Sequence, residues 1–428
     1  MHIYFSGIGG TGIGPLALVA KQAGYEVSGS DSHDSGYLKY LTTHGITDIH
    51  VGQSAEKLAE VHGRKPIDWF VYSSALPKTD PNHPELAYVT ENGIRASKRD
   101  EFLSEILIDK KLKLIAIAGT HGKTTTTAMA IWLFKQLGVP VSYSVGAKMS
   151  FGEMGQYDKA SEYFVYEADE YDRNFLAFHP YMSLITGIDW DHPDIYPTRE
   201  NYYEAFGRFI GQSEHAALWQ SDVERLKHPP TDHQMVLDEA DPKISKLKLD
   251  GLVNRQNAWI VANGLGPILN KPVDELAEKL NDFPGLSRRW EQIAPSVYSD
   301  YAHTPGKIRG ALQLAHEVAS ENVVVVYEGL HNLRQHFIKD ELKNLFDDVK
   351  QLYIVPSYLA REDPNLPTLS PDDIKNLLSE EARAKASAAA LDDKLKNKIK
   401  QHVVAGDTVL CLSAGGSGSL DEWLRHEF

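Results

Sequence analysis

The sequence predicts an α/β fold divided into three domains. Short apolar runs of strand length alternate along the chain with segments of helical periodicity, a pattern typical of parallel sheets covered by helices. Two of these runs end in glycine-rich turns, at residues 7–12 and 119–125, where a strand is expected to pass into a helix. A chain of 428 residues is also too long for one hydrophobic core. We therefore expect domains at residues 1–109, 110–293 and 294–428.

The composition restricts the class of protein. Apolar residues make up 42% and charged residues 24%, as in ordinary soluble globular chains. With 44 basic and 59 acidic residues the formal net charge is −15, which argues against a general affinity for nucleic acid or an anionic membrane. Cys411 is the single cysteine, which excludes an intrachain disulfide and fits a reducing compartment. No apolar run is long enough to span a bilayer and no signal peptide is recognised, so we expect a cytoplasmic protein without nucleic-acid or membrane partners.

The first domain opens with a predicted strand, a glycine-rich turn and a helix. The strand at residues 3–5 leads into Gly7, Gly9, Gly10 and Gly12, and residues 15–23 have helical periodicity. These glycines follow the dinucleotide-binding fingerprint, and Asp31, after a second strand at 26–29, is placed to meet a ribose hydroxyl. Alone, the pattern fits NAD, FAD, a UDP-sugar or no ligand. It predicts a Rossmann-like domain with a further strand at 69–72, followed by Ser73 and Ser74, and a last helix at 98–107.

The second domain begins with a stronger signal for phosphate binding. An apolar run at 114–118 precedes Gly119-Thr120-His121-Gly122-Lys123-Thr124-Thr125, and a helical pattern follows at 126–137. Such a loop directs backbone N–H groups and a helix N-terminus at an anion, and Lys123 adds a positive charge. The hydroxyl of Thr124 is placed to reach a magnesium ion on the nucleotide phosphates. The alternative is a tight strand-to-helix turn that happens to contain Lys-Thr. Glycines at this spacing, followed by Lys-Thr-Thr at the end of a strand, favour phosphate binding over this alternative.

Two later strands place polar residues beside this loop. Strand 163–166 ends in Glu167-Ala168-Asp169-Glu170, and strand 182–186 is followed by Asp191-His192. Carboxylates and a neutral imidazole at adjacent ends of parallel strands are suited to a metal ion. For any one of them, a solvated acidic turn or a hydrogen-bonded loop histidine is the simpler interpretation.

The rest of the chain predicts a helix, a domain junction and a third domain. Asn254 is expected to cap a helix that contains Asn257 and runs to about residue 264. Two arginines, Arg288 and Arg289, precede the junction; they could form only a solvated hinge or could equally reach a γ-phosphate. Beyond the junction, a polar turn with Asp300 and His303 opens a predicted helix at 306–318. Strands are expected at 323–327, 351–355 and 408–412. Residues 380–400 are expected to form an exposed helix and loop.

Together these motifs resemble the Mur ligases, ATP-dependent amide-forming enzymes of peptidoglycan precursor synthesis. The resemblance covers nearly the whole chain through six motifs in the family's order: residues 7–12, 119–125, 167–170, 191–192, 288–290 and 300–303. His121 is typical of the alanine-adding branch and its recycling relative. The resemblance therefore implies a Rossmann-like N-terminal domain, a P-loop ATP-binding central domain and a Rossmann-like C-terminal domain.

The resemblance also implies a role for each motif residue. Lys123 would contact the ATP phosphates, and Thr124, Glu167 and His192 would bind Mg²⁺. Arg289 and Asp300 match positions at the phosphate and ribose. The remaining expected ligand contacts are Gly119, Thr120, His121, Gly122, Thr125, Asn254, Asn257 and His303 for the nucleotide, and Gly7, Gly9, Gly10, Gly12, Asp31, Ser73 and Ser74 for the UDP-sugar. The expected catalytic set is Lys123, Glu167, His192 and Arg289.

The implied reaction activates a carboxylate. ATP phosphorylates the carboxylate of UDP-N-acetylmuramate, and the amino group of an amino acid, expected to be L-alanine, displaces phosphate from the acyl phosphate. The ligase would serve peptidoglycan synthesis, and with it cell wall biogenesis, cell shape and cell division, as a monomer or homodimer. Departures from the family pattern fall at Gly187, Val253, Trp290 and Thr304, and the register of Arg334 is undecided. These bear on adenine affinity and amino-acid choice more than on the reaction.

Three other functions remain open from the sequence. A recycling ligase would add a preformed tripeptide to the same sugar nucleotide. An NAD-dependent oxidoreductase would explain the first glycine fingerprint but leave the phosphate loop and both metal motifs unexplained. A catalytically silent nucleotide-binding regulator would be consistent with the departures. Phosphate release that requires UDP-N-acetylmuramate and L-alanine would favour the alanine-adding ligase, and release with the tripeptide but not with alanine the recycling ligase. Nicotinamide reduction would favour the oxidoreductase, and ATP binding without turnover the regulator.

Overall fold

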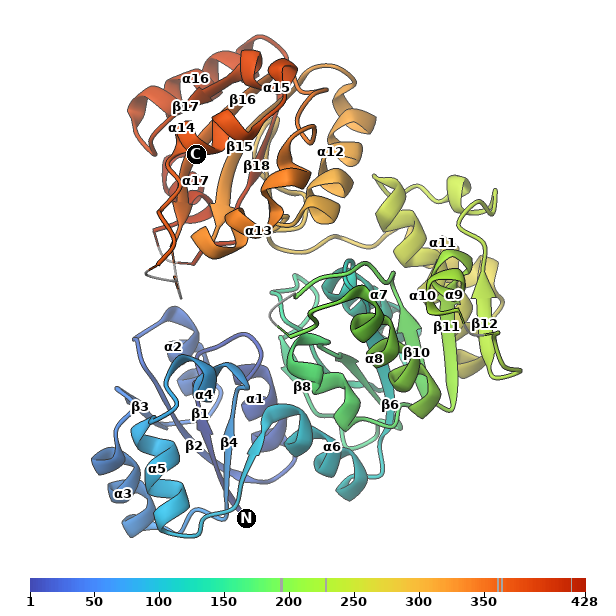
Figure 1. Ribbon diagram of the computed structural model, residues 1–428. Helices are drawn as coiled ribbons and strands as arrows, with labels where there is room; N and C mark the ends of the chain where they lie inside the picture. The colour runs from blue at the N-terminus through green and yellow to red at the C-terminus, as the bar shows by residue number, and fades with distance from the viewer. Residues whose placement is uncertain (193–194, 228, 360–361, 363–364, 417) are drawn as a thin grey trace. The chain divides into compact units, whose positions relative to one another are not determined.

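The computed structural model describes residues 1–428 except 193–194, 228, 360–361, 363–364 and 417, and the described residues form three sheets (Figure 1). The chain divides into two compact units, which are described separately. The first comprises Met1–Leu247 and Gln256–Phe283, and the second comprises Lys248–Arg255 and Pro284–Phe428. Two sheets belong to the first unit and one to the second. The α/β class predicted from the alternation of strands and helices is confirmed.

The first sheet of the first unit has the order β3-β2-β1-β4-β5, and all its described pairings are parallel. Strands β2 and β3 lie on one side of β1, and β4 and β5 lie on the other, so the strand order reverses at β1. In open α/β sheets, ligands bind at the carboxyl ends of the strands beside such a reversal. The glycine loop 7–12 directly follows β1. The elements are β1 (His2–Ser6), α1 (Gly14–Gln22), β2 (Glu26–Asp31), α2 (Gly36–Thr43), β3 (Asp48–Val51), α3 (Ala55–Arg64), β4 (Trp69–Tyr72), α4 (Ala75–Thr79), α5 (Pro84–Glu91), β5 (Ala96–Lys98) and α6 (Arg99–Asp109).

The second sheet has the order β12-β11-β10-β6-β9-β7-β8. The described neighbours pair in parallel except β7 and β8, which are antiparallel. Strand β6, which carries the phosphate loop, lies between β9 and β10, so the polar motifs after these strands meet at one edge. The elements are β6 (Lys113–Ala118), α7 (Lys123–Gln136), β7 (Ser142–Ser144), β8 (Gly155–Gln156), β9 (Tyr163–Glu167), η1 (Tyr171–Ala177), β10 (Met182–Ile185), α8 (Arg199–Gln212), β11 (His215–Trp219), α9 (Gln220–Leu226), β12 (Gln234–Leu237), η2 (Ile244–Lys246), α10 (Leu252–Leu269) and α11 (Val273–Leu280).

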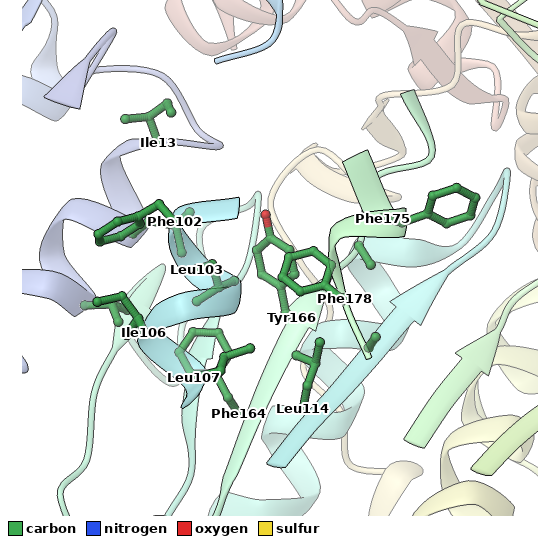
Figure 2. Packing of buried hydrophobic residues seen from close by; sticks show 14 of the residues in the cluster. Ile13, Phe102, Leu103, Ile106, Leu107, Leu114, Phe164, Tyr166, Phe175 and Phe178 are labelled. Atoms are coloured by element: carbon green, nitrogen blue, oxygen red, sulfur yellow. The ribbon is translucent and has the colours of Figure 1, made fainter. Parts of the chain in front are cut away.

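A continuous hydrophobic core joins the two sheets of the first unit. Helix α6 buries Phe102, Leu103, Ile106 and Leu107 in the same cluster as side chains of β1, β6 and β9. Figure 2 shows Leu103 and Leu107 of α6 close to Tyr166 and Phe164 of β9. Burying each large apolar side chain contributes about 1.5–3 kcal/mol, so the junction between the two sheets is part of the folded core.

The second unit contains a six-stranded sheet among its described residues. Its order is β13-β14-β18-β15-β16-β17, with β13 antiparallel to β14 and the remaining pairs parallel. Strands β15 and β18 are buried along their whole length, as expected for strands covered on both faces. The elements are β13 (Glu291–Ala294), β14 (Val297–Asp300), α12 (Pro305–Ala319), β15 (Val323–Leu330), α13 (Asn332–Leu342), β16 (Gln351–Tyr358), α14 (Pro371–Leu377), α15 (Glu380–Lys385), β17 (Ala386–Ala388), α16 (Asp393–Val404), β18 (Thr408–Leu412) and α17 (Leu420–Glu427).

The structure corrects three local expectations. Helix α7 begins at Lys123 rather than at residue 126, because Gly122 adopts a left-handed conformation that turns the chain directly into the helix. Strand β17 interrupts the segment 380–400, where only helix and loop were expected, because Ala386–Ala388 pairs with β16. Strand β15 extends to Leu330, so Glu328 lies inside a strand. No helix among the described residues is both long and apolar enough to cross a membrane.

Candidate functional site

The phosphate loop connects β6 to α7 and depends on two glycines. Gly119 has φ +142°, and a Cβ atom there would lie 2.3 Å from Thr186 Oγ1. Gly122 has φ +75°, and a Cβ atom there would lie 2.6 Å from Asn257 Oδ1. Both positions therefore combine a backbone conformation that favours glycine with a close neighbour that excludes a side chain. The loop predicted from its glycine spacing is present, with Lys123 at the first helical position.

Lys123 forms a buried ion pair at this loop. Its Nζ atom lies 2.6 Å from Glu170 Oε2 and 2.6 Å from the carbonyl oxygen of Gly119. Only 14% of the Lys123 side chain and 1% of the Glu170 side chain are exposed. Burial opposes the charged ammonium, but the carboxylates of Glu170 and Asp169 outweigh it and raise the pKa of Lys123 above its ordinary value. Lys123 is thus a fixed positive charge beside the loop amides.

A carboxylate and a hydroxyl meet at the C-terminal end of β9. Thr124 Oγ1 donates to Glu167 Oε1 at 2.9 Å. The second carboxylate oxygen, Oε2, is buried and has no hydrogen-bond partner among the described residues. A buried carboxylate oxygen without a donor suits a cation, and Mg²⁺ is commonly held by one or two carboxylates together with phosphate oxygens. No group of three or more His, Cys, Asp or Glu residues within the described chain could hold a metal by itself. Glu167 and Thr124 therefore suit a cation shared with a ligand's phosphates.

His192 lies near Glu170 in this structure. Its Nε2 atom is 3.8 Å from Glu170 Oε1 and 3.9 Å from Asp191 Oδ2. Its ring packs edge-on against Tyr171, with 5.0 Å between the ring centroids. His192 itself has φ +57°, a conformation that few non-glycine residues adopt. The sharing of one Mg²⁺ ion by His192, Thr124 and Glu167 remains a prediction.

A series of charged side chains begins at His121 in the phosphate loop. His121 Nε2 lies 3.4 Å from Asp189 Oδ2, and Arg225 Nη2 lies 3.6 Å from Asp189 Oδ1. Arg225 Nη1 also donates to Asp222 Oδ1 at 3.0 Å, and the same oxygen accepts the backbone N–H of Ile188 at 2.8 Å. Burial raises the pKa of Asp222 to about 6, although Ile188 and Arg225 oppose this shift. The histidine of the loop is therefore linked to a buried carboxyl group on α9.

The two asparagines of α10 have different surroundings. Asn257 is buried and lies against Gly122 of the phosphate loop. The expectation that Asn254 caps the helix is wrong, because α10 already begins at Leu252 and the Asn254 side chain donates to the carbonyl oxygen of Asp250 at 2.9 Å. Asn254 belongs to the second unit and Asn257 to the first. A direct contact of either residue with adenine remains a prediction.

The glycine loop after β1 is held by side chains from neighbouring elements. The backbone N–H of Gly9 donates to Asp31 Oδ2 at 2.8 Å, so Asp31 holds the loop in this structure. Gly7 has φ +78°, and Gly10 donates to the carbonyl oxygen of Gly7 at 3.0 Å. Below the loop, Glu85 is fully buried and accepts hydroxyl hydrogen bonds from Tyr4 at 3.0 Å, Ser6 at 2.6 Å and Ser30 at 2.6 Å.

Ser73 and Ser74 lie where β4 passes into α4. Ser73 Oγ accepts the N–H of Ala75 at 3.3 Å, and Ser74 Oγ accepts Asn174 Nδ2 at 3.1 Å. Asn174 belongs to η1, which directly follows the acidic motif 167–170. Ser74 therefore connects the end of β4 in the first sheet to η1, which follows the acidic motif of the second sheet. Direct contact of the glycine loop, Asp31, Ser73 or Ser74 with a UDP-sugar remains a prediction.

In the second unit, the structure brings Arg289, Asp300 and His303 into one turn region. The Asp300 carboxylate accepts the N–H groups of Trp290 and Ala302, each at 2.8 Å. Burial raises the pKa of Asp300, although Arg289 and Arg288 oppose the shift. The Arg289 guanidinium lies 4.6 Å from the ring centre of Tyr301, and His303 Nδ1 lies 2.8 Å from the Tyr301 carbonyl oxygen. Asp300 organises this turn in the structure, and its contact with a ribose stays a prediction.

The residues that depart from the family pattern have defined surroundings. Gly187 has φ +135°, and its carbonyl oxygen accepts the N–H of Thr120 in the phosphate loop at 2.8 Å. Thr304 is the N-cap residue of α12, and Trp290 stacks on Tyr298 with 4.3 Å between the ring centroids. Val253 is 39% exposed. Gly187 therefore supports the loop through its backbone carbonyl group. This contact does not require a side chain at position 187.

The sequence interpretation missed three members of the first unit's site. Glu170 was part of the quoted acidic motif, but its pairing with Lys123 was not predicted. Arg99, whose Nη2 atom donates to Asp169 Oδ2 at 3.0 Å, and Asp222 were not singled out at all. Their partners are 70 and 34 residues away in sequence, so no local pattern could reveal them. The only available signal was that polar residues gather where parallel strands end.

Comparison with known proteins finds similarity to Mur ligases along nearly the whole chain. Residues 2–111 match "Mur ligase family, catalytic domain", 117–233 match "Mur ligase middle domain", and 288–415 match "Mur ligase, glutamate ligase domain". The UDP-N-acetylmuramate–L-alanine ligase of Symbiobacterium thermophilum is 28% identical over 455 aligned positions, which cover 96% of this chain and 92% of the relative. Among solved structures, the UDP-N-acetylmuramate-alanine ligase of Thermotoga maritima has a TM-score of 0.76 at 24% identity and covers 100% of this chain and 98% of its own.

A murein peptide ligase of Psychrobacter arcticus shares the fold at a TM-score of 0.67 and 21% identity, covering 100% of this chain and 98% of its own. The resemblance seen in the six sequence motifs is thus borne out by matches to all three parts of the family's chain. The chain belongs to the Mur ligase family of ATP-dependent ligases.

Proposed function

We propose that this Mur ligase joins L-alanine to the carboxylate of UDP-N-acetylmuramate with ATP as the energy source. The observation that carries the proposal is the phosphate loop in which Lys123 meets the buried carboxylate of Glu170 and Thr124 meets the half-buried carboxylate of Glu167. Several relatives with this activity in their names align along nearly the full chain, which favours L-alanine as the amino acid. The product serves peptidoglycan synthesis.

The first chemical step is transfer of the γ-phosphoryl group of ATP to the carboxylate. The carboxylate oxygen attacks phosphorus, the bond to the β-phosphate oxygen breaks, and ADP leaves. We assign to Lys123 and the N–H groups at the start of α7 the stabilisation of the charge that spreads over the transferred group. This step is needed because a carboxylate is a poor electrophile, whereas the acyl phosphate has a good leaving group.

The second step forms the amide. The amino group of the amino acid attacks the acyl carbon, and the tetrahedral intermediate expels phosphate and loses a proton. Little side-chain acid–base chemistry is required, so the protein's main contribution is to hold three substrates in a reactive arrangement. We assign Arg289 to the phosphate and His303 to the nucleotide or substrate on the second unit, and Asn257 to the adenine side of the first.

The residues of the phosphate site fit Mg²⁺. Thr124 and Glu167 would hold the ion together with phosphate oxygens, and the unpartnered Oε2 atom of Glu167 supports this assignment. We assign His192 to the same region because it lies beside the Glu170–Lys123 pair. The ion would neutralise phosphate charge and so assist phosphoryl transfer. The UDP-sugar is assigned to the first sheet, on Gly7, Gly9, Gly10, Gly12, Asp31, Ser73 and Ser74.

The deciding experiment measures phosphate release from ATP by the purified chain. We expect release only when both UDP-N-acetylmuramate and L-alanine are present, with the amide product identified by mass spectrometry. Release with the tripeptide L-alanyl-γ-D-glutamyl-meso-diaminopimelate but not with L-alanine would replace this proposal by the recycling reaction. If the chain binds ATP but releases no phosphate with either substrate combination, a ligase function would be contradicted.

A further inference from the structure

Arg99 lies between two loops that follow different sheets of the first unit. It is the first residue of α6, and its Nη2 atom donates to Asp169 Oδ2 at 3.0 Å beside the end of β9. A Cβ atom built on Gly12 would lie 1.8 Å from Arg99 Nη1, so the guanidinium group rests directly on the glycine loop after β1. Arg99 therefore contacts both the loop assigned to the UDP-sugar and the acidic motif beside the phosphate loop.

The position of the guanidinium group is fixed by buried partners. Its Nε atom donates to Asp100 Oδ2 at 3.1 Å, and Asp100 is 1% exposed. The other Asp100 oxygen accepts the hydroxyl of Tyr166, on β9, at 2.7 Å. Figure 2 shows Tyr166 beside the apolar side chains of α6. Arg99 is thus positioned by Asp100 on α6, the helix that joins the two sheets. Asp100 is in turn held by Tyr166 on β9 of the second sheet.

From Asp169 the contacts continue to the phosphate loop. The next residue, Glu170, accepts Lys123 Nζ at 2.6 Å. Gly12, Arg99, Asp169-Glu170 and Lys123 therefore form a continuous series of contacts between the two ligand loops.

We propose that Arg99 is a positioning residue that fixes the separation of the UDP-sugar loop and the phosphate loop, an inference that rests on the proposed function. In-line transfer requires the carboxylate oxygen and the γ-phosphorus to approach closely, at about 3–3.5 Å, and a 1 Å misplacement can cost about 100-fold in rate. The two reactants are assigned to loops of different sheets. A planar guanidinium group can meet Gly12, Asp100 and Asp169 in three directions at once, which a lysine ammonium at the end of a flexible chain does less well.

The same junction offers a matched control. Lys78 and Lys98 both donate to Asp172, at 2.7 Å and 2.6 Å, and Asp172 follows Asp169 by three residues. These lysines also connect the first sheet to the loop after β9, but they are 37% and 32% exposed and have no described contact with Gly12 or Asp169. Loss of Lys78 therefore removes an ion pair across the junction without removing the Arg99 contacts.

The experiment compares Arg99→Met, Arg99→Lys and Lys78→Met in steady-state ligation. We expect kcat to fall about 100-fold in Arg99→Met, with only partial recovery in Arg99→Lys, because loop separation affects the reacting geometry. KM for each substrate, and the Kd values of UDP-N-acetylmuramate alone and ADP alone by calorimetry, should change by less than about threefold, because each loop still binds its own ligand. Lys78→Met should keep wild-type kcat.

Four results would overturn the role of Arg99. They are wild-type kcat in Arg99→Met, full recovery by Arg99→Lys, an equal loss in Lys78→Met, and a loss confined to KM. The third would show that Arg99 only joins the two sheets, and the fourth would show a direct ligand contact. If the wild-type chain releases no phosphate with UDP-N-acetylmuramate and L-alanine, the proposed function fails; if it does and Arg99→Met behaves like wild type, only the role of Arg99 fails.

A second variant keeps the test possible if Arg99→Met does not fold. Gly12→Ala places a methyl group where Nη1 now lies, so it should displace the guanidinium group and lower kcat. In an Arg99→Lys background the same substitution should cost less, because the crowding atom has gone. Equal effects of Gly12→Ala in both backgrounds would contradict the contact between Gly12 and Arg99 as the cause.

Discussion

Lys123 Nζ lies 2.6 Å from Glu170 Oε2, and this carboxylate is almost completely buried. The residue expected to bind nucleotide phosphates is therefore paired with a protein carboxylate in this structure. An incoming phosphate group carries the same sign of charge as Glu170 and competes with it for Lys123. We therefore expect the pair to weaken nucleotide binding electrostatically while it keeps the lysine at the loop.

Glu170→Gln should bind ADP more tightly in the absence of magnesium. Removing one buried negative charge beside the phosphate site is expected to lower the Kd by about tenfold, because Coulomb repulsion is weakly screened there. Calorimetric titration at fixed ionic strength measures this change. Glu162→Gln removes the same charge from an exposed side chain paired with Lys113 and should leave the Kd unchanged. Equal or weaker ADP binding by Glu170→Gln would contradict the competition.

Lys123→Ala should abolish ligation and leave UDP-sugar binding intact. The variant loses the cation that stabilises the transferred phosphoryl group, so we expect phosphate release to fall by about 1,000-fold or more. The Kd of UDP-N-acetylmuramate should remain within about twofold, because its assigned site lies on the first sheet. Lys113→Ala, at the exposed start of β6, is the control and should retain activity. Near-normal ligation by Lys123→Ala would refute the assignment of the phosphate loop.

Asp222 should make stability depend on pH in the mildly acidic range. Burial raises its pKa to about 6 in the folded protein, above the ordinary value of 3.8, so the folded state binds the proton more tightly than the unfolded state. Stability from this group is fully present below about pH 4 and decreases as pH rises toward 6, by about 3 kcal/mol in total. Urea unfolding of wild type and Asp222→Asn across pH 4–7 measures the effect as a difference. A constant difference over this range would contradict the shifted pKa.

Glu85→Ala should destabilise the first unit. The substitution leaves the buried hydroxyls of Tyr4, Ser6 and Ser30 without their shared acceptor and opens a cavity below the glycine loop. We expect a loss of about 3 kcal/mol in the free energy of unfolding, measured by urea denaturation. Glu91→Ala, an exposed position on the same helix, should change it by less than about 0.5 kcal/mol. Comparable losses in both variants would show that helix content, not the buried carboxylate, is responsible.

The sequence by itself determined the α/β class, the phosphate loop and the family. These features depend on residues that are contiguous or regularly spaced, such as the apolar run before Gly119 and the Lys123-Thr124 pair after Gly122, so local physics already specifies the strand, turn and helix. Boundaries that depend on more distant pairing were less predictable. Ala386–Ala388 becomes a strand only because β16 offers an edge, and Asn254 is not a cap because the chain turns into α10 two residues earlier.

Only the tertiary structure decided which charged groups meet. Strand order places β9 and β10 on either side of β6, and this brings Glu170 to Lys123 across 47 residues and His192 to Glu170. The shared core around α6 brings Arg99 to Asp169 across 70 residues. Such contacts depend on sheet order, helix packing and desolvation, which act between segments far apart in the chain. The sequence could therefore indicate the chemistry of the site, whereas only the fold decided which charged groups form pairs.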